Sequence, residues 1–118
     1  MKIAIVWASK DRSKYGNKIL RDLVNKWHEV IAVNPKEIEI EGIRCINDIV
    51  SLPGDVEVIN IVTPPWITIK VLEELDKIWL KNVWCQPGAT DKTTIEFLKE
   101  KWFKYIANAC IMLSPTPK

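Results

Sequence analysis

The sequence lacks the histidine and cysteine patterns of metal-binding and disulfide-rich proteins and the long apolar runs of membrane proteins. It has one histidine and three cysteines, Cys45, Cys85 and Cys110, with no CxxC pair. This spacing indicates neither a zinc site nor a disulfide framework, so we interpret the cysteines as reduced thiols of a cytoplasmic protein. No apolar run approaches the roughly 20 residues needed to cross a bilayer, and the N-terminus lacks the apolar core of a signal peptide.

The charge balance argues against two further kinds of partner. With 17 basic and 15 acidic residues, the net charge of +2 is too small to indicate binding to nucleic acid or to a membrane surface. The length of 118 residues predicts one domain, residues 1–118, that is long enough to bury a core. The hydrophobic content of 47% and the charged content of 27% are ordinary for a soluble globular protein.

Strand patterns and helix patterns alternate along the whole chain. Apolar, β-branched runs predict strands, and apolar residues that repeat on one helical face predict helices between them. The predicted strands cover residues 3–7, 29–33, 44–46, 56–62, 82–85 and 104–107. This alternation predicts an α/β fold, a three-layer Rossmann-like, doubly wound, mainly parallel sheet of five to six strands with helices on both faces.

Turn and capping residues delimit the predicted helices. Asn47 is a candidate cap for a helical turn over 47–52, and Thr63-Pro64-Pro65 is a strong helix-start signal. Thr90 or Asp91 caps the last predicted helix, and residues 108–118 are expected to form a proline-containing tail.

Four polar or proline-rich turns follow the predicted strands, at 8–15, 34–36, 63–65 and 86–88. Parallel α/β sheets bind ligands outside the carboxyl ends of their strands, at the point where the strand order reverses. The first turn carries serines and several cations and leads into a helix, whose N-terminal N–H groups and dipole favour a phosphate. The sequence therefore predicts a nucleotide-type site at this edge of the sheet.

The first two turns narrow the choice of nucleotide. A dinucleotide site of the usual kind has G-x-G-x-x-G in the first turn and an acidic residue after the second strand. Here the first turn has only Gly16, and the second strand ends in Asn34-Pro35-Lys36, which argues against NAD. A lysine suits a phosphorylated ribose, as in NADP or coenzyme A, although a solvated turn lysine is the simpler interpretation of Lys36 alone.

Several motifs in this order resemble a known family. They are AS-KDRSKYGNKI, VIAVNPKEI, IVTPP, VWCQPGA and NACIM, and they span nearly the whole chain. The sequence resembles the small CoA-binding domain proteins, Rossmann-like relatives of the N-terminal domain of the succinyl-CoA synthetase α-subunit. The resemblance implies that the first turn holds the phosphates of CoA, the second the adenosine with its 3′-phosphate, and the last two the pantetheine arm. The implied binding residues are Ala8, Ser9, Lys14, Tyr15, Gly16, Asn34, Pro35, Lys36, Thr63, Pro64, Pro65, Cys85, Gln86, Pro87 and Gly88.

No catalytic set can be assembled from the sequence. The larger relatives use a phosphorylated histidine, but His28 stands at the end of the first predicted helix, on the opposite edge. Cys85 lies in a site turn, where a packed strand-end cysteine is favoured over a reactive thiol. We therefore predict a non-catalytic module that binds CoA or an acyl-CoA, with a regulatory role, a homodimer and a protein partner left open. The alternatives are an NADP-binding reductase-like domain and a protein-interaction module that has lost nucleotide binding.

The tryptophans stand at unexpected positions. The chain has six tryptophans but only four glycines, about half of the average glycine share of about 7%. Trp27, Trp79 and Trp102 each end a predicted helix, at the position where φ is usually positive and glycine is preferred. Trp7 stands where the family has glycine, and its indole is expected to fill the cleft or to prop the first turn open. We hypothesise that several of the five tryptophans Trp7, Trp27, Trp66, Trp79 and Trp102 are glycines in the natural protein, either misread through a reassigned codon or replaced deliberately. The alternative is drift within the lineage, with aromatic residues filling the core.

Overall fold

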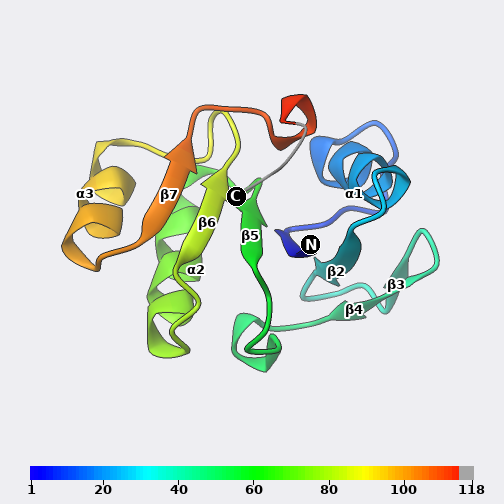
Figure 1. Cartoon of the computed structure of the whole chain (residues 1–118), viewed down its shortest axis with the longest axis horizontal. Coiled ribbons are helices and arrows are strands. Elements are labelled where there is room, and N and C mark those ends of the chain that lie inside the picture. Colours follow the sequence, from blue (N-terminus) through cyan, green and yellow to red (C-terminus); the bar gives the residue numbers. More distant parts are fainter. Residues whose placement is uncertain (115–118) are drawn as a thin grey trace.

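The computed structural model describes residues 1–114, in which a central sheet lies between helices on its two faces (Figure 1). The strands are β1 (Lys2–Val6), β2 (Glu29–Val33), β3 (Glu39–Ile40), β4 (Ile43–Ile46), β5 (Val58–Ile61), β6 (Asn82–Cys85) and β7 (Lys104–Ala107). The helices are α1 (Tyr15–Asn25), α2 (Pro65–Lys77) and α3 (Lys92–Glu100), with the short 3₁₀ helices η1 (Ile49–Ser51) and η2 (Ile111–Leu113).

The sheet has the order β3-β4-β2-β1-β5-β6-β7, and every neighbouring pair is parallel except β3 with β4. The chain winds outward from β1 in one direction through β2 and in the other through β5. The strand order therefore reverses at β1, and the predicted doubly wound, mainly parallel sheet is confirmed.

The sheet has seven strands where five to six were predicted. The additional strand, β3, has only two residues and pairs antiparallel with β4, so that Glu39 lies opposite Arg44. The chain reverses at Glu41 and Gly42, which both have positive φ values, 49° and 80°. Since β3 covers the outer side of β4, the strand predicted over residues 44–46 is paired on both sides. Two residues are too few to give an alternation that identifies a strand from sequence.

Alternate residues of β1 supply the two halves of the core. Ile3 and Ile5 pack with the α1 residues, whereas Ala4 and Val6 pack with those of α2 and α3. The buried helix residues are Ile19, Leu20 and Leu23 of α1, Val71, Leu72 and Leu75 of α2, and Leu98 of α3. Side chains alternate between the two faces of a strand, so each face of the sheet has apolar residues for helices to cover. β5 and β6 are almost completely buried, as expected for strands that have packing layers on both faces. Helices thus cover both faces of the sheet, as predicted.

The helix starts match the capping signals with one correction. Pro64 is the N-cap of α2, and Asp91 caps α3 with its side chain accepting from the Thr94 N–H at 2.9 Å. The cap of η1 is Asp48, not the predicted Asn47. The Asn47 side chain instead donates to the carbonyls of Asn34 and Glu37, so it holds the turn after β2.

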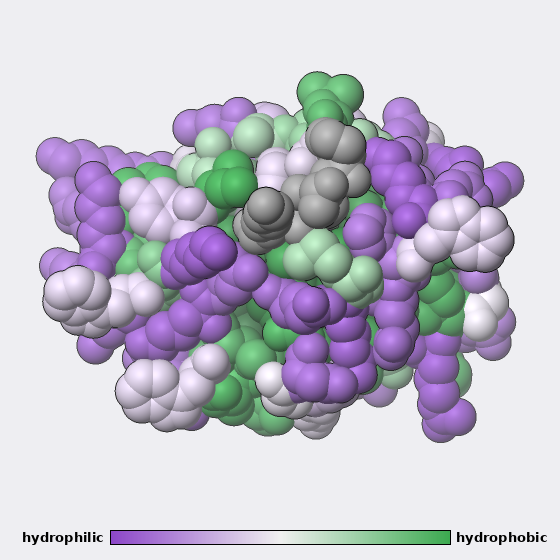
Figure 2. All heavy atoms as spheres, in the orientation of Figure 1, coloured by the Kyte–Doolittle hydropathy of each residue, from purple (hydrophilic) through white to green (hydrophobic). Residues whose placement is uncertain are grey.

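The predicted C-terminal tail is partly ordered into η2, while residues 115–118 lie outside the described residues. Figure 2 shows that polar side chains occupy much of the visible face, with apolar side chains between them. Within residues 1–114, no helix has the length and hydropathy that a membrane span requires.

Candidate functional site at the carboxyl edge of the sheet

The turn from β1 to α1 leaves a helix N-terminus uncapped by any side chain. Lys14 is the N-cap residue of α1, and its side chain makes no capping hydrogen bond. The first turn of a helix has N–H groups without partners inside the helix, and the helix dipole places partial positive charge there. This end of α1 is therefore available to an anion.

Gly16 allows the start of α1 to lie against the β1 turn. A Cβ atom at this position would lie 2.5 Å from the Trp7 carbonyl oxygen and 3.2 Å from the Ser9 nitrogen. Any other residue would force the two backbones apart, because atoms in folded proteins do not approach so closely. The glycine here serves close packing, since its φ is not among the positive ones.

A cleft of about 480 Å³ lies over this turn. It is bounded by the segments that follow β1, β2 and β5, together with the start of α1. It brings together eight of the predicted residues, Ala8, Ser9, Lys14, Tyr15, Gly16, Asn34, Thr63 and Pro64, and it also includes Trp7, Ser13 and Val62. Trp7 packs against the core on the α2 side and also lines the cleft.

A smaller pocket of about 120 Å³ adjoins the cleft through Tyr15 and Val62. The other residues lining it are Gln86 and Pro87, which were predicted, and Cys110, which was not. Cys110 lies in the NACIM motif noted in the sequence, and the fold carries that segment back over the β6 turn.

Gln86 is fixed in place beside this pocket. Its side chain is buried, and its Oε1 atom accepts from Asn60 Nδ2 at 3.0 Å and from the Ile111 N–H at 2.9 Å. These two bonds join β5, the β6 turn and η2. The wall of the pocket is thus held by three segments that are distant in the sequence.

The remaining predicted residues do not line either cavity. Pro35 and Lys36 are exposed in the turn after Asn34, Pro65 begins α2, and Gly88 lies in an exposed turn with a φ of 86°. Cys85 is fully buried, and burial raises the pKa of its thiol to about 12. At neutral pH this cysteine is a protonated core residue without nucleophilic character.

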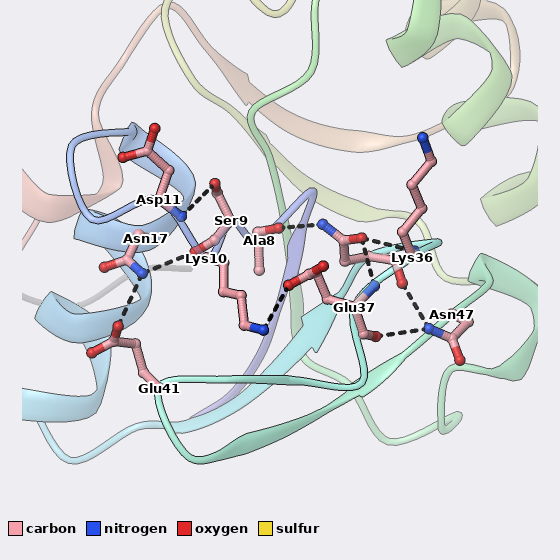
Figure 3. Close-up of polar contacts among 10 residues, drawn as sticks. Ala8, Ser9, Lys10, Asp11, Asn17, Lys36, Glu37, Glu41 and Asn47 are labelled. Atoms are coloured by element: carbon pink, nitrogen blue, oxygen red, sulfur yellow. Dashed lines mark hydrogen bonds and ion pairs between the residues drawn. The ribbon is translucent and has the colours of Figure 1, made fainter.

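A polar network holds the first turn in place (Figure 3). Asn17 Nδ2 donates to the Ser9 carbonyl at 2.9 Å and to Glu41 Oε2 at 3.2 Å. Asn34 Nδ2 donates to the Ala8 carbonyl at 2.8 Å, which ties this turn to the end of β2. The sequence did not identify Asn17 or Glu41, because their partners come from distant segments. These bonds tie the turn to α1, to the end of β2 and to Glu41.

The network leaves particular groups of the first turn free. Lys10 pairs with Glu37 at 3.4 Å and Arg12 with Glu41 at 3.5 Å, whereas Lys14 has no carboxylate partner within residues 1–114. The Ser9 hydroxyl accepts from the Asp11 N–H, so its hydrogen remains available to donate. Lys14, the Ser9 hydroxyl and the α1 N–H groups form a donor set suited to phosphate.

Within residues 1–114, neither the histidine nor a metal-binding cluster lies at this edge. His28 lies at the opposite end of α1, with Nδ1 3.2 Å from the N-terminal amine, and burial is the main reason that its pKa is lowered. Residues 1–114 hold no cluster of three or more side chains suited to binding a metal ion.

Comparison with known proteins gives concordant results. The family model described as CoA binding domain matches residues 1–115. An ADP-forming acetate–CoA ligase from Methanocaldococcus jannaschii is 35% identical over 80 residues, which cover 68% of this chain but only 11% of the ligase. The chain therefore spans about a tenth of the length of this curated relative.

Solved structures that share the fold include the following two. A conserved hypothetical protein from Pyrococcus furiosus has a TM-score of 0.93 and 44% identity, with 95% of this chain and 97% of that chain covered. A hypothetical protein from Pyrococcus horikoshii has a TM-score of 0.86 and 29% identity, with 94% and 78% covered.

Proposed function

The chain belongs to the CoA-binding domain family, and we propose that it binds coenzyme A or an acyl-CoA as a non-catalytic, single-domain module over residues 1–118. The observation that carries the proposal is the uncapped N-terminus of α1, which opens into a cleft of about 480 Å³ at the point where the strand order reverses. Such a position is where open α/β sheets bind nucleotides.

The pyrophosphate of CoA would lie against the start of α1. Gly16 brings the backbone close, and the Ser9 hydroxyl and the Lys14 ammonium add a neutral and a charged donor. Hydrogen bonds from charged donors to phosphate are roughly twice as strong as those between neutral groups. Because the turn is already held by Asn17 and Asn34, little ordering entropy remains to oppose binding.

The adenosine with its 3′-phosphate would lie at the turn after β2. Asn34 Oδ1 accepts from the N–H groups of Lys36 and Glu37, which fixes the shape of the turn. Figure 3 shows the Lys36 side chain extending away from Glu37 and Asn47, and within residues 1–114 its ammonium makes no ion pair that would compete with a phosphate. Lys36 thus has the role of distinguishing CoA from dephospho-CoA.

The pantetheine arm would pass over Tyr15 and Val62 toward the pocket beside Gln86 and Pro87. The Thr63 hydroxyl is engaged with Thr68 Oγ1 at 2.8 Å, so this turn contributes shape more than hydrogen bonding. The pantetheine arm is uncharged, so it suits a wall of proline and apolar side chains.

The test is thermal unfolding of the chain with CoA, dephospho-CoA and NADP in parallel. A ligand at 100 times its dissociation constant adds about 2.7 kcal/mol to the free energy of unfolding, a shift of several degrees. We expect the largest shift with CoA, a smaller one with dephospho-CoA, and none with NADP. In a Lys36→Ala variant, CoA and dephospho-CoA should become equivalent.

Two results would contradict the proposal. Equal stabilisation by NADP and CoA would indicate a reductase-like nucleotide site that does not use the pantetheine arm. No stabilisation of either the chain or its Trp7→Gly variant would indicate a module that has kept the fold but lost the ligand.

A further inference from the structure

Three helices end in the same way, each with a tryptophan at the residue that reverses the chain. Trp27, Trp79 and Trp102 follow α1, α2 and α3, and their φ values are 67°, 59° and 61°. These are left-handed conformations, in which a side chain at Cβ crowds the following carbonyl. The positive φ expected from the sequence is confirmed at all three positions.

The hydrogen bonds identify each end as a Schellman motif. In such a motif the residue after the left-handed one donates to the carbonyl five residues earlier, and the left-handed residue donates three residues back. The first bond joins His28 N to Leu23 O (3.1 Å), Leu80 N to Leu75 O (3.2 Å) and Phe103 N to Leu98 O (3.0 Å). The second joins Trp27 N to Val24 O (3.0 Å), Trp79 N to Asp76 O (3.4 Å) and Trp102 N to Lys99 O (3.3 Å). All three ends thus have the geometry that glycine favours.

The indoles gain little burial in return for this conformation. Trp27 is 94% exposed, Trp79 is 79% exposed and Trp102 is 88% exposed. The Lys81 ammonium lies 4.8 Å from the centre of the Trp79 ring, an exposed contact of small value. A tryptophan that binds a partner protein can do so from an ordinary backbone conformation. Partner binding therefore does not explain why all three tryptophans have a positive φ.

The other tryptophans provide an internal contrast. Trp84 is 6% exposed within β6, and its Nε1 donates to the Ala109 carbonyl at 2.7 Å, as a tryptophan selected for its side chain would. Trp66 is exposed but lies inside α2 without a positive φ, where glycine would weaken the helix. The geometry of Trp66 therefore does not support the hypothesis that this tryptophan replaces a glycine.

We infer that positions 27, 79 and 102 are glycine in the protein as its source organism makes it. In this inference, the source organism reads as glycine a codon that the printed sequence translates as tryptophan at these positions. UGA is the natural candidate, because different genetic codes read it as stop, tryptophan or glycine. Trp84 would be encoded by UGG.

Peptide mass spectrometry of the protein from its source organism tests the inference directly. We expect the peptides that contain positions 27, 79 and 102 to be lighter than the masses calculated from the printed sequence. For each such position the difference should equal that between a tryptophan and a glycine residue. The peptide that contains position 84 should keep the tryptophan mass. Tryptophan at positions 27, 79 and 102 in the native protein would overturn the inference, as would UGG codons there.

Thermal unfolding of the recombinant chain, with tryptophan at all six positions, tests the physical premise separately. Trp27→Gly, Trp79→Gly and Trp102→Gly should each raise the unfolding temperature by roughly 4 °C, and the triple variant by more. Trp66→Gly is the matched control, an exposed tryptophan with no positive φ, and should lower it or leave it unchanged. If the three variants behave like the control, left-handed strain does not distinguish these positions, and the inference fails.

Discussion

The N-termini of α1 and α3 lie at the same edge of the sheet, since both helices follow parallel strands, but they are completed in opposite ways. At α3 the Asp91 carboxylate accepts from the Thr94 N–H at 2.9 Å, and the Thr94 hydroxyl accepts from the Asp91 N–H at 2.7 Å. At α1 no side chain caps the helix, and Lys14, at the N-cap position, makes no ion pair within residues 1–114.

The difference separates a structural helix end from the one that we propose binds the ligand. The capping box satisfies the N–H groups of Asp91 and Thr94 inside the protein, so fewer donors remain there for a ligand. An uncapped end beside a cleft forgoes that stabilisation and keeps its donors for an anion. Changing each end in turn should therefore affect stability at one and binding at the other.

Replacing Gly16 should have the largest effect, because it alters the binding end by steric overlap. In Gly16→Ala the new Cβ meets the Trp7 carbonyl, a backbone atom that cannot move cheaply. We expect a loss of about 1–3 kcal/mol in the free energy of unfolding, together with a loss of CoA affinity of more than tenfold. Denaturant unfolding and calorimetric titration measure the two effects.

Gly54→Ala is the control for this prediction. Gly54 has no atom within 4 Å of a built Cβ and no positive φ, so alanine there should change neither stability nor affinity. A Gly16→Ala variant as stable and as active in binding as Gly54→Ala would show that α1 need not approach the turn so closely.

Removing the charge at the binding end should weaken the ligand and spare the fold. Lys14→Ala should lower CoA affinity by roughly 10- to 150-fold, since one hydrogen bond to a charged group contributes about 1.5–3 kcal/mol. The unfolding temperature without ligand should not change, because Lys14 makes no ion pair within residues 1–114. Lys70→Ala, on the exposed side of α2, is the matched charge removal, and equal affinities for the two variants would argue against a phosphate at α1.

Breaking the capped end should do the reverse. Asp91→Ala removes the side-chain acceptor of the α3 capping box and should cost about 1 kcal/mol in the free energy of unfolding. Its CoA affinity should equal that of the unmodified chain, as measured by titration below the unfolding transition. Weaker CoA binding by Asp91→Ala would mean that the two helix ends are not independent.

The smallest effect is expected from pH, at the other edge of the sheet. Burial, the N-terminal ammonium and Lys26 lower the pKa of His28 from its ordinary value of 6.5. The unfolded chain then binds the proton more readily than the folded one, so stability should fall as the pH drops through about 6.5. The unfolding temperature should be slightly lower at pH 5.5 than at 7.5, and His28→Gln should reduce the difference. An equal difference in the variant would assign it to another group.

Local sequence signals predicted the helix ends and the position of the cleft well. Alternating strand and helix patterns led to the parallel sheet, and Asp91 was identified as a candidate cap because capping depends on residues three positions apart. The conformations of Trp27, Trp79 and Trp102 were predictable for the same reason, since each depends only on the helix before it.

Contacts between distant segments were not predictable. The strand β3 exists because Ile40 is buried and its backbone pairs with β4, and two residues carry no periodic signal. Cys110 joins the pocket beside Gln86 because the Ile111 N–H binds the Gln86 side chain, a link across 25 residues. Cys85 was counted with the site from its motif, yet its side chain is buried in the core.

The sequence alone thus determined the succession of strands and helices along the chain. It also determined which turns lie at the carboxyl edge of the sheet and which residues those turns contain, because these features follow from spacing within a few residues. The tertiary structure decided which of those residues face the same cleft. It also decided that Asn17 and Asn34 hold the first turn and that Lys14 makes no ion pair among residues 1–114. Those outcomes depend on which distant backbone atoms come within hydrogen-bonding distance, and only the packed sheet and helices fix that.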